Sequence, residues 1–275
     1  SFACRTEKDD PDTYHARFPD RITGALADSA MVVTAHPVAT RIGVAVLKEG
    51  GNAVDAAVAV QFALAVVYPD AGNIGGGGFM ILRQNDAQTY SLDFREKAPA
   101  AASRDMYLDS TGAFNDSLSW YGHLAAGVPG TVAGMEAAWE RFGSLPWEKL
   151  LAPAIKLARE GYMLTAKEAA KLNRHLDAIR AVNTIPPDQF LGTWAEGDTI
   201  RNPDLARTLE LISRHGREGF YEGETAEKIV AEMDRGEGII SMEDLAAYEP
   251  VWREPVTGNY KDYRVISMAP PSSGG

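Results

Sequence analysis

Arg95 is the residue with the clearest potential for chemistry, because it lies beside two carboxylates, Asp93 and Glu96, at the end of a β-prone run. A guanidinium is a planar fork that can bind a carboxylate through two parallel hydrogen bonds. One interpretation of Arg95 is therefore a binding residue for a substrate carboxylate. The other is a structural ion pair with Asp93 or Glu96. The two are compatible, since adjacent acids could hold the fork in place.

Two glycine-rich segments could approach a ligand. Gly75–Gly78 is a run of four glycines, which can take positive φ and lie close to a neighbour. A phosphate-binding loop would continue with Gly-Lys-Ser/Thr into a helix, whereas Phe79 opens a predicted strand, so we favour a tight helix-to-strand crossing. The segment 127–134 (GVPGTVAG) imitates a dinucleotide-binding fingerprint, but its proline and the weak preceding strand favour a closely packed helix start.

Other catalytic patterns are missing from the sequence. The five histidines show no metal-binding spacing such as HExxH, and there is no Gly-x-Ser-x-Gly motif. Cys4 is the only cysteine, which excludes an internal disulfide and a cysteine-based zinc site. We therefore predict no metal, no cofactor and no self-contained Ser/His/Asp site on this chain.

The composition indicates an acidic globular protein. Of the 275 residues 45% are hydrophobic, and 38 acidic against 27 basic residues give a formal net charge of −11. This charge repels a phosphate backbone, so we exclude nucleic acid as a partner. The longest apolar run, Ala53–Val67, is shorter than the roughly 20 residues that a bilayer span requires, so we predict no transmembrane helix.

Residues 1–30 are predicted to be an N-terminal tail or tether. The first four residues, ending at Cys4, resemble the end of a bacterial lipoprotein signal, and the polar residues 5–13 suit a flexible tether. Cys4 is interpreted either as a lipid anchor or as an incidental thiol in an unstructured terminus.

The elements that would position Arg95 begin with a predicted strand at 31–33 and two helices, 37–48 and 53–67. Pro37 suits the first turn of a helix, and Asn52 followed by Asp55 suits a helix cap. The second helix is apolar on nearly all faces, so we expect it to be buried and central. Strands 79–84 and 89–94 then form a predicted hairpin, with Asp93 and Arg95 on the same face at its end.

The rest of the chain is predicted to be mainly helical, with strands returning at the end. A capping box at Ser241 and Asp244 predicts a short helix that ends at Tyr248. Strands at both ends of a helical block predict an α+β fold. The chain stops in a turn-rich string directly after a strand, which favours a fragment. The remaining predicted helices are 131–142, 146–160, 166–181, 203–215 and 225–234, and the remaining strands are 251–260 and 263–268.

Five motifs, in order along the chain, resemble the large subunit of the γ-glutamyltranspeptidases. They are KEGGNAVDAAVAV (48–60), AGNIGGGGFM (71–80), DFREKAP (93–99), GVPGTVAG (127–134) and VISMAPPSSGG (265–275). The similarity extends from about Met31 to Gly275. Residues 31–275 are accordingly interpreted as a γ-glutamyltranspeptidase large-subunit region, truncated before the autocleavage site.

The resemblance implies an N-terminal nucleophile (Ntn) hydrolase with an αββα sandwich, whose sheets are incomplete without a small subunit from the same precursor. The implied nucleophile is a threonine that opens the small subunit beyond Gly275, so no catalytic residue is expected in this chain. The single binding residue carried over is Arg95, whose counterpart holds the α-carboxylate of the γ-glutamyl group.

The implied activity is γ-glutamyl transfer from glutathione and related compounds to water, amino acids or peptides, in the periplasm or cell envelope. One alternative is another activity on the same scaffold, either a cephalosporin-type acylase or a poly-γ-glutamate processing enzyme. A second alternative, from a different class, is a non-catalytic module that binds an anion or nucleotide through Gly75–Gly78.

Overall fold

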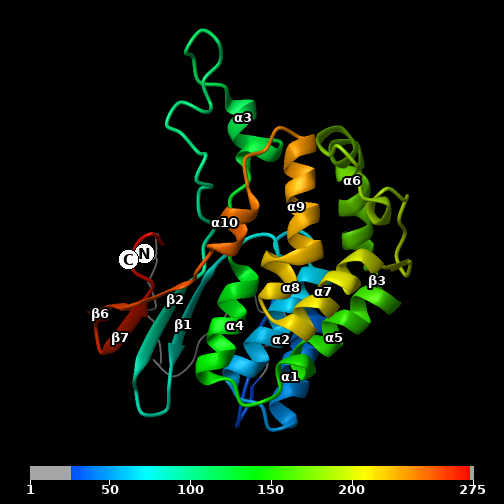
Figure 1. Ribbon diagram of the computed structural model, residues 1–275. Coiled ribbons are helices and arrows are strands. Elements are labelled where there is room, and N and C mark those ends of the chain that lie inside the picture. The colour runs from blue at the N-terminus through cyan, green and yellow to red at the C-terminus, as the bar shows by residue number, and fades with distance from the viewer. Residues whose placement is uncertain (1–25, 273–275) are drawn as a thin grey trace, which may run out of the picture. The chain divides into compact units, whose positions relative to one another are not determined.

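The computed structural model describes residues 26–272 (Figure 1). The chain divides into two units, Ser1–Met31 and Val32–Gly275. Residues 26–31 of the first unit contain neither helix nor strand. Cys4 and residues 1–25 of the predicted tail lie outside the described residues. All elements named below belong to the second unit.

Two consecutive helices, α1 (Pro37–Lys48) and α2 (Ala53–Val67), have the bounds that the sequence predicts. Asn52 caps α2 by accepting the N–H groups of Val54 and Asp55, while the Asp55 side chain accepts the N–H of Asn52. No residue from Val54 to Tyr68 is exposed, which confirms the prediction of a buried central helix.

A three-stranded antiparallel sheet has the order β1 (Phe79–Arg83), β2 (Thr89–Asp93) and β5 (Val251–Arg253). In its register Phe79 lies opposite Asp93, which in turn lies opposite Val251. The predicted hairpin is confirmed, and each of its strands is one residue shorter than expected. The end of β2, where Arg95 follows, therefore lies between the start of β1 and the start of β5.

The helical block between the strands is also present, with bounds within two residues of those predicted. It contains α4 (Thr131–Phe142), α5 (Trp147–Glu160), α6 (Ala166–Val182), α7 (Pro203–His215), α9 (Gly223–Arg235) and α10 (Met242–Ala246). The sequence did not predict the short helices α3 (Asp116–Trp120) and α8 (Glu218–Tyr221), nor the strand pair β3 (Tyr162–Met163) and β4 (Thr199–Ile200).

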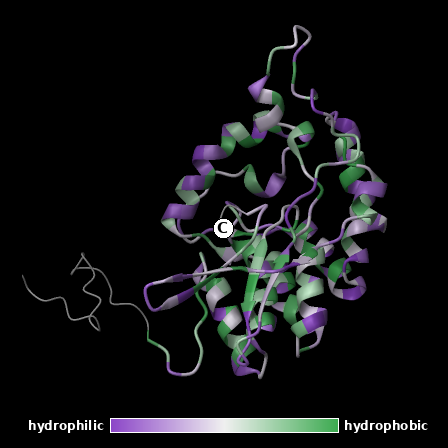
Figure 2. Ribbon diagram, turned by 90° about the vertical axis from the view of Figure 1, so that its left-hand side faces the viewer, coloured by the Kyte–Doolittle hydropathy of each residue, from purple (hydrophilic) through white to green (hydrophobic). Residues whose placement is uncertain are grey.

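The helices pack beside the sheet around one core. Helix α2 contacts α1, α4 and α5, and α4 contacts β2, so the helical layer reaches the strand that precedes Arg95. Figure 2 shows hydrophobic residues gathered along the central strands and the helices beside them. The largest fully buried side chains include Phe62, Leu92, Leu150, Leu151, Leu209, Ile212, Tyr221, Leu245 and Tyr248. Strands flank a helical block, which confirms the α+β class.

Two strand predictions are wrong. Residues 31–33 form no strand, because a strand needs a hydrogen-bonded neighbour and none of the described strands pairs with this segment. The predicted strand 251–260 is two strands, because Pro255 lacks an N–H for the ladder. Before it, β5 pairs with β2; after it, β6 (Val256–Tyr260) pairs with β7 (Tyr263–Ser267) in a separate hairpin.

Candidate functional site

Arg95 lies directly after β2, where the strand makes one further backbone pair. Phe94 and Gly78 exchange two hydrogen bonds, with N···O distances of 3.0 and 3.3 Å. The Phe94 side chain is buried beneath α4, and Arg95 is exposed. The sequence therefore folds so that a buried apolar residue precedes a solvent-facing cation.

The backbone of Arg95 is held on both sides of its Cα atom. Its N–H donates to Oδ1 of Asp93 at 3.0 Å, and its carbonyl oxygen accepts the hydroxyl of Tyr248 at 2.8 Å. Two residues further on, Lys97 exchanges two backbone hydrogen bonds with Val128. The segment around Arg95 is thus fixed although its strand has already ended.

The guanidinium of Arg95 is not neutralised by the neighbouring acids. Among the described residues it forms no ion pair, and its one hydrogen bond goes to the carbonyl oxygen of Pro271 at 3.4 Å. Asp93 is instead paired with Arg253 on β5, with 2.8 Å between Oδ2 and Nε. The predicted structural ion pair of Arg95 with Asp93 or Glu96 is therefore wrong, and so is the expectation that these acids hold its fork.

Tyr248 is a buried hydrogen-bond donor to this segment. Its ring stacks on Tyr221, with 5.8 Å between ring centroids and 7° between planes, and the ammonium of Lys97 lies 4.9 Å from its ring centroid. Burial raises the pKa of the Tyr248 hydroxyl, and the carboxylates of Asp93 and Glu96 raise it further. The hydroxyl therefore keeps its proton and donates to Arg95.

The glycine segments serve close packing, as the sequence favours. A Cβ on Gly77 would lie 2.5 Å from the carbonyl oxygen of Phe94, and one on Gly130 would lie 2.1 Å from both that oxygen and the Tyr248 hydroxyl. The carbonyl of Gly76 accepts the N–H groups of Gly130 and Thr131, at the start of α4. These first amides of the helix are thus already bonded, and so are the amides of Gly76, to Oδ1 of Asn73, and of Gly78, to the carbonyl oxygen of Phe94.

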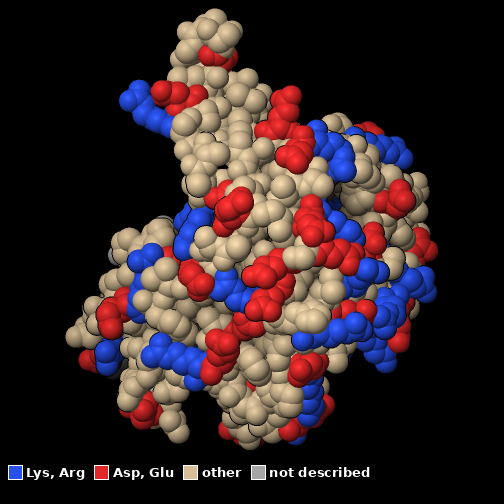
Figure 3. Space-filling view, viewed as in Figure 1, with Lys and Arg blue, Asp and Glu red and all other residues tan. Residues whose placement is uncertain are grey.

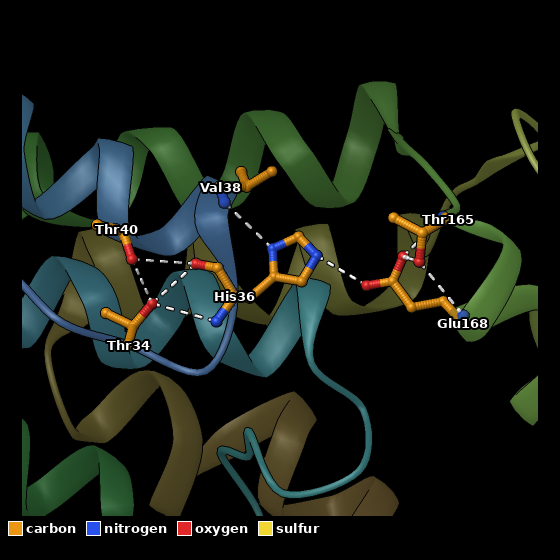
Figure 4. Close-up of polar contacts among 6 residues, drawn as sticks. All are labelled: Thr34, His36, Val38, Thr40, Thr165 and Glu168. Carbon is orange, nitrogen blue, oxygen red and sulfur yellow. Dashed lines mark hydrogen bonds and ion pairs between the residues drawn. The ribbon is translucent and has the colours of Figure 1, made fainter. Parts of the chain in front are cut away.

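His36 belongs to a second polar cluster, drawn in Figure 4, which joins α1 to α6. Its Nδ1 accepts the N–H of Val38 at 3.2 Å, so Nε2 carries the proton and donates to Glu168 at 2.8 Å. Glu168 also accepts the hydroxyl and N–H of Thr165. Although burial raises the pKa of Glu168, these hydrogen bonds and His36 lower it more, so the net pKa is lowered. The cluster caps two helices.

A cavity of about 720 Å³ lies beside this cluster, between α6 and the adjoining ends of α1 and α2. Neither Arg95 nor the residues that hold its backbone line the cavity. Arg95 itself stands on the surface. This cavity and the exposed guanidinium of Arg95 are therefore in different places.

Charged side chains are mixed on the face of the molecule that Figure 3 shows. On the face drawn in Figure 3, acidic and basic side chains alternate without a large patch of either sign. Within residues 26–272, no three histidine, cysteine or acidic side chains come together in a way that could hold a metal ion. In the same range no helix is both long and apolar enough to cross a bilayer.

Sequence reasoning named Arg95 as a candidate but did not name Tyr248, which bonds to its backbone, or Arg253, which pairs with Asp93. Tyr248 was predicted only as the end of a short helix, and Arg253 only as part of a strand. Local sequence patterns cannot reveal a contact between residues about 150 positions apart. To predict the contacts of Tyr248 and Arg253, one would have had to know that β5 is the strand beside β2.

The fold defines the class of protein. Solved Ntn-hydrolase structures, both γ-glutamyltranspeptidases and an acylase, share it over nearly the whole chain. That of Helicobacter pylori γ-glutamyltranspeptidase superimposes with a TM-score of 0.88 at 46% identity, covering 92% of this chain and 73% of that chain. That of a cephalosporin acylase from Bacillus halodurans gives 0.81 at 31% identity, covering 96% of this chain and 50% of that chain.

The sequence identifies the family within this class. The profile described as Gamma-glutamyltranspeptidase matches residues 39–275. The chain belongs to the γ-glutamyltranspeptidase family and corresponds to the N-terminal, large-subunit part of its members. It is 46% identical over 255 residues to the glutathione hydrolase proenzyme of Escherichia coli, covering 90% of this chain and 43% of that protein. The chain thus spans less than half the length of this relative.

Proposed function

We propose that this chain supplies the γ-glutamyl-binding part of a γ-glutamyltransferase or glutathione hydrolase, in which Arg95 binds the α-carboxylate of the γ-glutamyl group. The observation that carries the proposal is the state of Arg95: an exposed guanidinium that has no carboxylate partner among residues 26–272, on a backbone that is held from both sides. A fork in this state can bind an incoming carboxylate through two hydrogen bonds.

The chemical step would use a threonine that opens a small subunit derived from the same precursor, in sequence following Gly275. Its hydroxyl would give its proton to its own α-amino group and attack the γ-amide carbon of glutathione or a related γ-glutamyl compound. The amide C–N bond would then break, and the amine half of the substrate would leave with that proton. The resulting acyl-enzyme would pass the γ-glutamyl group to water or to an amino-acid or peptide amine. Arg95 contributes by orienting the glutamyl end toward the nucleophile, which is a proximity effect.

The experiment is Arg95→Ala in the complete, processed protein, with hydrolysis of γ-glutamyl-p-nitroanilide as the readout. Loss of the guanidinium leaves a substrate carboxylate unpaired, which we expect to cost about 3–5 kcal/mol, or roughly two to four decades in kcat/KM. Arg104→Ala is the control, because that arginine is 94% exposed and pairs only with the adjacent Asp105. Near-normal hydrolysis by the Arg95 variant would sink the assignment.

A second candidate is an acylase activity, favoured by the close superposition on the B. halodurans cephalosporin acylase. Arg95 could serve both activities, because a glutaryl group carries a carboxylate in the corresponding place and lacks only the α-amine. Comparing kcat/KM for γ-glutamyl and glutaryl anilides distinguishes the two. A strong preference for the γ-glutamyl compound supports the transferase, and equal or higher rates with the glutaryl compound support the acylase.

We also propose that the protein acts in the periplasm or cell envelope, with Cys4 as a possible lipid attachment site. The support is the sequence that ends at Cys4 and the polar residues that follow it. Mass spectrometry of the N-terminus of protein purified from its native cells tests this. An acyl group on Cys4 supports the anchor, and an unmodified thiol removes it.

A further inference from the structure

We propose that Asp93, Arg253 and Tyr248 are positioning residues for Arg95, together called the Arg95 clamp. The clamp would fix the peptide groups on both sides of the Arg95 Cα atom, so that the guanidinium meets the substrate carboxylate without first having to order the chain. The inference rests on the proposed carboxylate-binding role of Arg95 and concerns how the fold makes that role effective.

The first half of the clamp acts on the N–H of Arg95. Asp93 is almost fully buried, with 8% of its side chain exposed, and uses one oxygen for the Arg95 N–H and the other for Nε of Arg253. A buried carboxylate without a cationic partner is costly, so the ion pair with Arg253 offsets the cost of burying Asp93 at this position. Arg253 thus acts on Arg95 through Asp93.

The second half acts on the carbonyl oxygen of Arg95. The Tyr248 side chain is fully buried and stacked on Tyr221, so its hydroxyl has a fixed position from which to donate to Arg95. The lack of a Cβ on Gly130 is what makes room for this hydroxyl, because a Cβ there would lie 2.1 Å from it.

Tyr248 and Arg253, two of the three clamp residues, lie in one short segment, residues 248–253. Lys97 also contacts this segment, because its ammonium donates a hydrogen bond to the carbonyl oxygen of Glu249 at 2.7 Å. The start of β5 is also bonded to the end of β2. The clamp is thus built from a segment that packs along the strand end carrying Arg95, and its two halves act together.

The clamp residues bond to the backbone of Arg95 and not to its guanidinium. The position of the backbone therefore determines where the guanidinium can reach. A rotation of either flanking peptide would swing the fork by more than the half ångström or so that a productive site tolerates. Such a displacement weakens the two-point contact to a carboxylate but leaves contacts elsewhere on the substrate unchanged. The clamp should therefore affect only the recognition of substrates that carry the carboxylate.

The test compares γ-glutamyl-p-nitroanilide with 4-aminobutanoyl-p-nitroanilide, which keeps the amine and lacks the α-carboxylate, in the complete processed protein. We expect Tyr248→Phe and Arg253→Ala to raise KM for the γ-glutamyl compound by about 10- to 100-fold, with a smaller effect on kcat. Rates with the 4-aminobutanoyl compound should stay at the wild-type value. Arg253→Lys should recover most of the loss, since a single charged contact to Asp93 is enough.

Tyr221→Phe is the matched control, because it removes a hydroxyl from the other ring of the same buried stack. That hydroxyl donates to the carbonyl oxygen of Pro129 and makes no contact with Arg95. Melting temperatures of all variants identify those that are merely unstable, and Tyr248→Phe keeps the test valid if Arg253→Ala does not fold. We expect Tyr221→Phe to lower the melting temperature without changing the preference for the carboxylate.

The outcomes separate this inference from the proposed function. If the wild-type protein prefers the γ-glutamyl compound and Arg95→Ala abolishes that preference, the role of Arg95 stands. An unchanged preference in Tyr248→Phe and Arg253→Ala would then overturn the clamp alone. A wild-type protein with no preference would overturn the role of Arg95 and the clamp with it.

Discussion

Asp93 forms its ion pair with Arg253, which is 160 residues away in sequence, and uses its second oxygen to hold the backbone N–H of Arg95. The same carboxylate therefore fixes the position of Arg95 without neutralising its charge. Had Asp93 paired with the Arg95 guanidinium, an incoming carboxylate would have to displace it. The pairing across β2 and β5 thus makes the arginine available for binding.

Arg95 and Arg253 should respond differently to replacement by lysine. Arg95→Lys keeps the charge but loses the fork, so at least one hydrogen bond to the substrate carboxylate is lost, worth about 1.5–3 kcal/mol. We expect kcat/KM for γ-glutamyl-p-nitroanilide to fall by roughly 10- to 100-fold. Arg253→Lys, which needs only one contact, should stay within a few-fold of wild type. Equal losses in steady-state kinetics would show that fork geometry is irrelevant at Arg95.

The elements around the site could be predicted from sequence where local chemistry sets their limits. Pro37 starts α1, and Asn52 with Asp55 starts α2, so the predicted bounds match the observed ones. The glycines of the crossing were also interpreted correctly, because Phe79 leads into a strand and no phosphate-loop lysine follows. In each case the deciding residues lie within a few positions of the element they define.

What could not be predicted depends on partners that are distant in sequence. The choice of Arg253 over Arg95 by Asp93 follows from the pairing of β2 with β5, which no local pattern reports. The strand predicted at 251–260 failed for a related reason: its residues are β-prone throughout, but Pro255 divides them between two different sheets. The fold class was accessible from sequence, whereas the residues that hold the backbone of Arg95 were not.

The four glycines should tolerate alanine unequally. A Cβ on Gly77 would lie within 3 Å of backbone atoms of three residues, 94 to 96, so we expect Gly77→Ala to destabilise the protein by about 1–3 kcal/mol or more. Gly75 does not have a positive φ, and a Cβ there would meet nothing within 4 Å. Gly75→Ala should be neutral or stabilising by about 0.4–1 kcal/mol. Urea unfolding measures the stability of both variants. A large loss of stability in Gly75→Ala would contradict the expectation that a Cβ at Gly75 meets no neighbour.

Asp55 should be one of the most sensitive polar residues for stability. It is fully buried, completes the cap of α2, and accepts three hydrogen bonds from Ser144 and Leu145 in the loop between α4 and α5. Asp55→Ala leaves these donors unpaired, so we expect a loss of about 2–4 kcal/mol in the free energy of unfolding. The control is Asp177→Ala, whose side chain is fully exposed, and it should cause no measurable change in urea unfolding.

Asp55 should also make stability depend on pH in the acid range. Although burial raises its pKa, hydrogen bonds from the Ser144 hydroxyl and from the N–H groups of Asn52, Ser144 and Leu145 lower it more, and the net pKa lies below the ordinary 3.8. A carboxyl whose pKa is lower in the folded protein contributes stability above pH 3.8 and loses that contribution as pH falls through the folded pKa.

Asp55→Asn removes this dependence, since an amide does not titrate. We expect the difference in unfolding free energy between wild type and Asp55→Asn to be constant from pH 7 to about 5 and to shrink below the ordinary carboxyl pKa. The pKa values of Glu168 and Asp244 are lowered too, so the variant should retain part of its acid sensitivity. Urea unfolding at a series of pH values measures this difference. A difference that stays constant down to pH 3 would show that the pKa of Asp55 is not lowered in the folded protein.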